Sequence, residues 1–289
     1  LFLSFIIFYM SKFILGTAQF GLGYGISNYN KKSAFDSFIK IKKICEKENI
    51  DTIDISDRYF DKNIFDKLTK TFKKKVYKIS NLTKKNFKIK IDEIINLENK
   101  TYCIMIHNSS ILKKSFFLNI LNYLIIKKKQ NRLEKIGISI YNVEDFWLSI
   151  KMFDENLDII QMPISIIDRR FLIKKILNKI KKNDFEIHAR SNFLQGMLLM
   201  HQRPTYFNKW KKLFKNWDKE KQIDKINICL NFIKKIKIIK KIVIGSEDEK
   251  QLLSIIRNYK KNISYKKIYY YKNFYSKELK LVNPTKWPF

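Results

Sequence analysis

Residues 135–163 read KIGISIYNVEDFWLSIKMFDENLDIIQMP, and this stretch decides the predicted fold. Residues 135–140 and 159–163 are short, mainly apolar runs closed by polar residues or proline, as in strands. Between them, residues 143–153 place apolar side chains at helical spacing. The stretch predicts a strand–helix–strand unit, whose two strands lie parallel because the helix carries the chain back through a right-handed crossover.

The same pattern extends in both directions along the chain. Further strand-like runs are predicted at residues 13–15, 52–55, 76–80, 102–106, 185–189 and 241–244, and further helical stretches at 33–45, 87–97 and 111–126. In the stretch 33–45, the apolar residues Phe35, Phe38, Ile39, Ile41 and Ile44 are expected to share one broad side. Most runs lack a polar–apolar alternation, which is typical of strands buried on both faces.

Eight strand–helix units predict either a closed barrel or an open, doubly wound sheet. No Gly-x-Gly-x-x-Gly turn lies between a strand and a helix, so a dinucleotide-binding open sheet is not indicated. The closed barrel is therefore favoured: an α/β fold of the (β/α)8 TIM barrel class, in a single domain over residues 10–289. The long gap between the seventh and eighth predicted strands is expected to hold a rim loop and an extra helix.

The composition is compatible with one large domain. The chain has 289 residues, 45% of them hydrophobic, and its 7 Gly and 4 Pro leave no room for a flexible linker. Residues 1–9 are apolar, but they are too few to span a bilayer and lack the basic region of a signal peptide. Met10 directly precedes the first predicted strand, so we expect the protein to start there.

The charge is extreme, because 59 Lys and Arg oppose 27 Asp and Glu, giving +32. Such a charge is compatible with a nucleic acid or an anionic membrane as partner. The lysines, however, occur in nearly every predicted helix rather than in one stripe. We interpret the charge as a compositional bias, with no specific nucleic acid partner and no membrane partner. Nothing in the sequence indicates an oligomeric state.

The three cysteines, Cys45, Cys103 and Cys229, form no CxxC pair, which excludes a disulfide framework and fits a reducing cytoplasm. His188 and His201 have no metal-ligand spacing, and neither has His107, so no metal site is predicted.

Four residues fall at or just past the ends of predicted strands: Asp54, Tyr59, His107 and Gln161. In a closed barrel of this kind, the carboxyl ends of the strands meet at one rim, and that rim carries the chemistry. A tyrosine, a carboxylate and a histidine brought together there are the parts of a proton-transfer site. The sequence therefore predicts an enzyme.

Seven segments of the chain resemble motifs of the aldo-keto reductases, particularly the bacterial branch found near surface-polysaccharide genes. They are LGTAQFG (15–21), IDISDRY (53–59), IMIHN (104–108), KIGISIY (135–141), DIIQMP (158–163), RSNFLQG (190–196) and IGS (244–246). The resemblance covers residues 13 to about 257 in order. It implies a TIM barrel, a nicotinamide cofactor, usually NADPH, and reversible reduction of a carbonyl on a small substrate, which the branch suggests is sugar-like.

The resemblance also implies catalytic roles. Tyr59 matches the family's acid, Asp54 the carboxylate that orients its lysine, and His107 the histidine that binds the substrate oxygen. The family places the lysine at the end of the third strand, where residues 77–82 read YKISNL and put Asn81 in register. Either Lys84 substitutes from the following loop while Lys78 points elsewhere, or the chemistry is weakened and the chain serves as a binding or scaffold protein.

The resemblance assigns cofactor contacts by position. Ser139 and Gln161 match residues that hold the nicotinamide carboxamide, and Arg190 stands where many relatives stack a tyrosine on the ring. The other matched positions are Gly16 and Thr17 in the first segment, Ser191, Leu194 and Gly196 in the pyrophosphate loop, and Gly245 and Ser246 at the adenosine phosphate. Gln251 occupies the place of the arginine that grips the 2′-phosphate, with Lys250 beside it. The resemblance predicts NADP(H), with NAD as the alternative.

Overall fold

The computed structural model describes residues 11–22, 37–59, 70 and 72–288. The expected start at Met10 and residues 1–9 lie outside the described residues. The first part of the expected helix at 33–45, including Phe35, also lies outside them.

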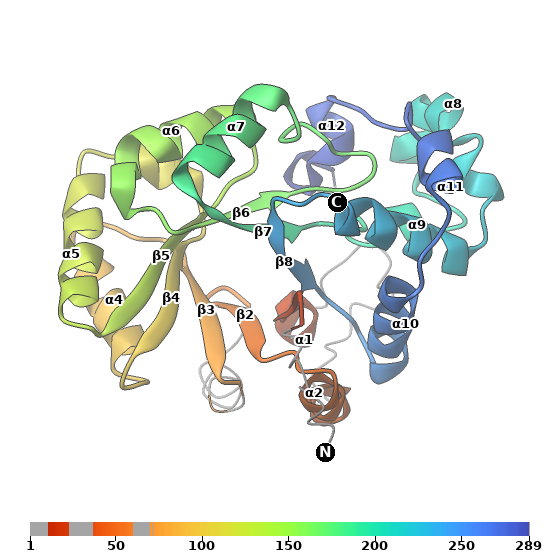
Figure 1. The fold of residues 1–289 in the computed structure, drawn as a ribbon. Helices are drawn as coiled ribbons and strands as arrows, with labels where there is room; N and C mark the ends of the chain where they lie inside the picture. The colour runs from red at the N-terminus through yellow and green to blue at the C-terminus, as the bar shows by residue number, and fades with distance from the viewer. Residues whose placement is uncertain (1–10, 23–36, 60–69, 71, 289) are drawn as a thin grey trace, which may run out of the picture.

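Eight strands form a closed barrel in which every neighbouring pair is parallel, in the order β1 to β8 (Figure 1). The register of β1 with β8, which pairs Phe13 with Ile242 and Leu15 with Ile244, closes the ring. The predicted barrel is thus confirmed, and each predicted strand lies within two residues of an observed one. The strands are Phe13–Gly16, Thr52–Ser56, Lys74–Ile79, Thr101–Ile106, Leu133–Ser139, Ile159–Pro163, Glu186–Arg190 and Ile239–Ile244.

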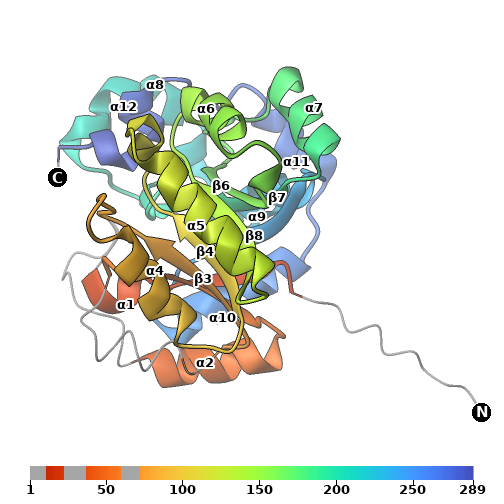
Figure 2. The ribbon, with the colours of Figure 1, turned by 90° about the vertical axis from the view of Figure 1, so that its left-hand side faces the viewer.

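Helices surround the barrel, and Figure 2 shows α4 and α5 running across its outside. The helices are α1 Ala18–Leu22, α2 Phe38–Lys47, α4 Phe87–Ile95, α5 Phe117–Lys129, α6 Val143–Phe153, α7 Lys174–Asn183, α8 Lys211–Phe214, α9 Gln222–Lys234, α10 Glu249–Lys260, α11 Tyr265–Tyr270 and α12 Leu279–Val282. Among the residues that the structure describes, none of these helices is long and apolar enough to cross a bilayer.

Two helix predictions were wrong in detail. The stretch 111–126 is not one helix, because a 3-10 turn, η2 (Ser109–Lys113), comes first and Lys114 is extended before α5 begins. Ile39 does not share the buried side of α2 either. It is 68% exposed, whereas Phe38 and Ile41 on the same helix are buried.

The barrel interior is filled in layers. Below the rim lies an apolar layer that includes Val76, Cys103, Met105 and Ile159. A Cβ on Gly137 would come within 3.0 Å of the Met105 methyl group and 3.3 Å of Ile159, so glycine relieves crowding where β5 crosses this layer. Val76 and Ile159 precede the rim residues Lys78 and Gln161 by two positions on the same strands, so this layer lies directly beneath the polar rim.

A second apolar core lies beside the barrel, at the expected insertion between β7 and β8. Its aromatic members from the insertion are Phe207, Trp210, Phe214 and Trp217, and it also includes Tyr271, Phe274, Leu281, Val282 and Trp287 from later in the chain. The insertion contains three 3-10 turns, η4 (Met197–Leu199), η5 (Thr205–Trp210) and η6 (Trp217–Lys219), together with α8. The expected rim loop and extra helix are confirmed, and Figures 1 and 2 both place α8 and α12 on the same side of the barrel.

Candidate active site

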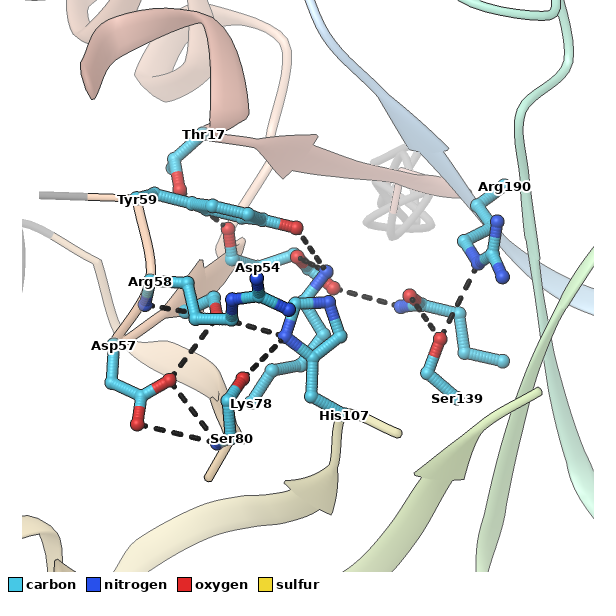
Figure 3. A network of polar contacts seen from close by, with 12 residues as sticks. Thr17, Asp54, Asp57, Arg58, Tyr59, Lys78, Ser80, His107, Ser139 and Arg190 are labelled. Carbon is cyan, nitrogen blue, oxygen red and sulfur yellow. Dashed lines mark hydrogen bonds and ion pairs between the residues drawn. The ribbon is translucent and has the colours of Figure 1, made fainter. Parts of the chain in front are cut away.

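Three side chains on the rim form one connected group (Figure 3). Asp54 lies in β2, Tyr59 in the turn that follows it, and Lys78 in β3. The ammonium of Lys78 lies 2.5 Å from Asp54 Oδ1 and donates a hydrogen bond to Tyr59 Oη at 3.2 Å. Asp54 and Lys78 are almost completely buried, so the charge pair is held in a medium of low polarity.

The lysine of this group is not the one that the sequence predicted. Lys84 is exposed in the loop after β3 and does not line the rim cavity. Asn81 is also exposed, with φ at 51°, a left-handed turn position that asparagine tolerates. The prediction that Lys78 points elsewhere was wrong, because alternation along β3 places Lys78 on the interior face, next to Asp54.

Burial and the ion pair set the protonation of this group. Burial alone would lower the pKa of Lys78, but Asp54 and Tyr59 outweigh it and the pKa lies above its usual value. Burial raises the pKa of Tyr59, and the neighbouring Lys78 offsets only part of that rise. Near neutral pH the lysine is therefore charged and the tyrosine carries its proton.

His107 follows β4 and stands edge-on to Tyr59, with 5.9 Å between the ring centroids. Burial, then the charges of Lys78, Arg190 and Arg58, lower the pKa of His107 to about 2, so the ring is neutral. A neutral imidazole carries hydrogen on only one nitrogen, and its neighbours decide which.

Two serine hydroxyls lie at the same nitrogen of His107. Ser56 Oγ is 3.0 Å and Ser80 Oγ 2.9 Å from Nδ1. Ser56 also accepts the backbone N–H of Arg58, which orients its hydroxyl. Neither serine was predicted as a site residue from the sequence, although the alternation that places Lys78 inside the barrel also places Ser80 there.

The end of β3 is held against the loop after β2 by Asp57 and Lys90. The Asp57 carboxylate accepts the backbone N–H of Ser80 at 3.1 Å. The Lys90 ammonium bridges Asp57 Oδ2 and the Ser80 carbonyl oxygen, at 3.0 Å from each. These contacts fix the backbone that positions Ser80.

Gln161 and Arg190 extend the polar network across the rim. Gln161 Nε2 donates to Asp54 Oδ2 at 2.7 Å. Arg190 donates to Ser139 Oγ at 3.3 Å and to the Ile140 carbonyl at 2.8 Å, and its guanidinium lies 4.0 Å from the centre of the Tyr141 ring. The described contacts of Arg190 include no carboxylate, so its charge is available to a ligand.

One cavity of about 810 Å³ is lined by most of these groups, although Ser56, Asp57, Ser80 and Lys90 lie behind its lining. It runs from Asp54, Tyr59, Lys78 and His107 past Arg190 to Lys250 and Gln251 on α10. Eight of the predicted cofactor positions line it: Gly16, Thr17, Ser139, Gln161, Arg190, Ser191, Gly196 and Gly245. Leu194 does not, because its side chain is buried in the second apolar core, and Ser246 is buried between two lining residues.

Two buried polar atoms, one on the lining residue Asn192 and one on Ser246, which follows the lining residue Gly245, have no hydrogen-bond partner among the described residues. They are Asn192 Oδ1 and Ser246 Oγ. Buried polar atoms are nearly always paired, but these two have almost no accessible surface and therefore do not face the cavity themselves. Beside them, Ser191, Leu194, Gln195 and Gly196 all have positive φ, which folds the loop tightly against the cavity. The polar side chains that do line the cavity, among them Ser139, Arg190 and Ser191, fit a polar ligand such as a dinucleotide.

The fold and the site together define a (β/α)8 barrel with a Tyr–Lys–Asp–His group on its rim. A scan against protein-family models and a search of curated proteins found no match. Among solved structures, an aldo-keto reductase from Bacillus halodurans in its holo form has a TM-score of 0.70 and 14% identity, over 92% of each chain. The glycerol dehydrogenase from Gluconobacter oxydans has a TM-score of 0.63 and 15% identity, over 95% of this chain and 93% of its own. This chain has the fold of the aldo-keto reductases.

Proposed function

We propose that this chain is a member of the aldo-keto reductase superfamily and reduces the carbonyl group of a small substrate with a nicotinamide dinucleotide. One observation carries the proposal: the Lys78 ammonium lies between Asp54 and Tyr59, at 2.5 and 3.2 Å. A buried tyrosine, lysine and carboxylate in direct contact, next to a neutral histidine in a cavity, form a poised proton donor.

The proposed reaction adds a hydride to the carbonyl carbon and a proton to its oxygen. The bound dinucleotide supplies the hydride. Tyr59 gives its proton to the substrate oxygen, and Lys78 stabilises the phenolate that this leaves. Asp54 keeps Lys78 charged. Gln161 donates to the other oxygen of Asp54 and so fixes the ion pair in position.

His107 binds the substrate oxygen in this proposal. Its Nδ1 accepts a hydrogen bond from Ser80 or Ser56, so that Nε2 carries the hydrogen. Nε2–H then donates to the oxygen on which negative charge develops. Because the ring stays neutral, it polarises the carbonyl without competing with Tyr59 as the proton donor.

The lining residues suggest how a dinucleotide would lie. Ser139, Gln161 and Arg190 would hold the nicotinamide, and Ser191 and Gly196 would lie along the phosphates. The substrate is proposed to be a small, sugar-like carbonyl compound, and the cytoplasm is the proposed location, in keeping with three buried free thiols.

The scaffold alternative rested on the absence of the family's lysine at Asn81. Lys78 supplies the missing charge from within β3, so that argument no longer favours a degenerate barrel. A polyanion-binding role rests only on the net charge of +32.

A comparison of Lys78→Met with Lys84→Met tests the proposal. Purified full-length protein is mixed with NADH or NADPH and a panel of small aldehydes that includes glyceraldehyde, and cofactor oxidation is followed. We expect wild type and Lys84→Met to turn over at similar rates. We expect Lys78→Met to lose about 10²–10⁴-fold in kcat, the range of general acid catalysis, while dinucleotide binding is retained.

Three outcomes would contradict the proposal. Unaltered turnover by Lys78→Met would remove the lysine from the mechanism. Binding of neither dinucleotide by wild type would remove the cofactor. Dinucleotide binding with no reduction of any aldehyde on the panel would favour the scaffold alternative.

A further inference from the structure

We propose that the far end of the cavity selects NADH over NADPH, and that Glu247 is the residue that determines this choice. The inference rests on the proposed function, since it concerns the adenosine half of the same dinucleotide. It opposes the NADP(H) preference that the resemblance predicts.

The shape of the cavity places the adenosine ribose near α10. The nicotinamide ring of a bound dinucleotide must lie at the end of the cavity that holds Tyr59, Lys78 and His107. The remaining length of the cavity runs to Glu247, Lys250 and Gln251 at the start of α10, with Gln222 and Ile226 of α9 opposite them. A dinucleotide that reaches Tyr59 at one end therefore has its second ribose beside the first turn of α10.

That turn is already occupied by carboxylates. Residues 247–249 are Glu, Asp and Glu. Asp248 Oδ1 accepts the backbone N–H of Gln251 at 2.8 Å and so caps the helix. The positive end of α10, which elsewhere serves as an anion site, is thus partly neutralised by the chain itself.

Glu247 is held facing the cavity by Gln251. The Glu247 backbone N–H donates to Gln251 Oε1 at 3.1 Å, and Gln251 Nε2 donates to Glu247 Oε2 at 3.3 Å. A carboxylate so placed can accept the hydroxyls of a ribose diol, whereas a 2′-phosphate would bring two like charges together. Gln251 is engaged with Glu247 and adds no positive charge.

The nearby cation does not reverse this preference. Lys250 lines the cavity, but it is exposed and strongly hydrated, and it lacks the planar fork with which arginine grips a phosphate. Among the described lining residues, Arg190 is the only arginine, and it donates to Ser139 at the end of β5, to the carbonyl of Ile140 just past it and to Ser191. The far end therefore presents a fixed carboxylate and one mobile ammonium.

Dissociation constants measured by quenching of tryptophan fluorescence test the proposal. Wild type is titrated with NADH and with NADPH, alongside Glu247→Gln and Glu249→Gln. We expect wild type to bind NADH at least about tenfold more tightly than NADPH, because a like-charge contact costs several kcal/mol. Glu247→Gln should bring the dissociation constants for NADPH and NADH closer together, mainly by strengthening NADPH binding.

Glu249→Gln is the matched control, because it removes the same charge from the same turn. Glu249 is bound to Lys40 at 3.2 Å and does not line the cavity, so its substitution should leave the ratio unchanged. Equal or tighter NADPH binding by wild type would overturn this inference and leave the proposed function standing. The same shift in both variants would also overturn it, and binding of neither dinucleotide would overturn both. If a variant fails to fold, the ratio of the wild-type dissociation constants for NADPH and NADH still tests the predicted preference.

Discussion

Asp54 engages two donors at once, one through each carboxylate oxygen, and this dual contact organises the site at the scale of single residues. Lys78 binds Oδ1 and Gln161 binds Oδ2. A buried ion pair is often no more stabilising than apolar residues of the same volume, although breaking it is costly. A fully buried lysine–aspartate pair beside a cavity is therefore better explained by function than by stability.

The two serines at His107 lead to a prediction about coupled substitutions. Each hydroxyl can hold Nδ1 alone, because Ser56 and Ser80 both lie within 3.0 Å of it. Ser56→Ala and Ser80→Ala should therefore each change kcat only slightly. The double variant should lower kcat by about tenfold, the equivalent of one lost hydrogen bond, since nothing then fixes the imidazole tautomer.

A double-mutant cycle on kcat, with dinucleotide affinity measured in parallel, checks this expectation. Cofactor binding should not change in any of the three variants. Effects that simply add would show that the serines act independently of one another, contrary to a shared role at Nδ1.

His107 should also leave a signature in the dependence of stability on pH. Its pKa lies at about 2 in the folded protein, against an ordinary 6.5 in the unfolded chain. Between these values the unfolded state binds one more proton, so the free energy of unfolding falls as the pH falls below 6.5. The slope from this group is up to about 1.4 kcal/mol per pH unit. Urea titrations at pH 7, 6 and 5 should show that His107→Gln loses less free energy of unfolding than wild type as the pH falls. Parallel pH dependences of the two proteins would contradict the lowered pKa of His107.

At the scale of elements, the strands could be predicted well and the helices less so. A short run of apolar residues between polar ones, such as 159–163, is typical of a strand that is buried on both faces. The predicted bounds of this run are the observed bounds of β6. The stretch 111–126 is apolar at helical spacing throughout, yet it divides at Lys114. Spacing alone does not reveal such a break, because the extended backbone there depends on packing.

Lys78 shows why part of the candidate site could not be predicted. Counting along the chain from the family's motif leads to Asn81, whereas the interior face of a strand is set by alternation, which leads to Lys78. The two positions differ because Asn81 lies three residues past Lys78 and two past the end of β3, in a left-handed turn outside the strand. Asp54, Tyr59 and His107 come together as predicted, since Asp54 lies near the end of β2, Tyr59 just past β2 and His107 just past β4.

At the scale of the whole molecule, the second apolar core connects the end of the chain to the cavity. Trp217 is fully buried, stacks on Phe274 with 4.8 Å between ring centroids, and donates through Nε1 to the Leu198 carbonyl at 2.8 Å. The next residues, Leu199 and Met200, line the cavity. Contacts made near the end of the chain therefore position one wall of the proposed dinucleotide site.

Trp217→Ala should accordingly reduce both stability and dinucleotide binding. Removing a buried tryptophan costs about 3–5 kcal/mol of unfolding free energy. Leu118→Ala on α5, where the side chain is 54% exposed, is the control and should stay within about 0.5 kcal/mol of wild type. Urea denaturation followed by circular dichroism should show a single transition shifted to lower urea.

The second core and the barrel should unfold together. The second core includes Ile228 and Cys229 of α9, a helix whose other face packs on the barrel. A separate early transition, with the main transition unmoved and binding intact, would instead mean that the second core folds independently and does not shape the cavity.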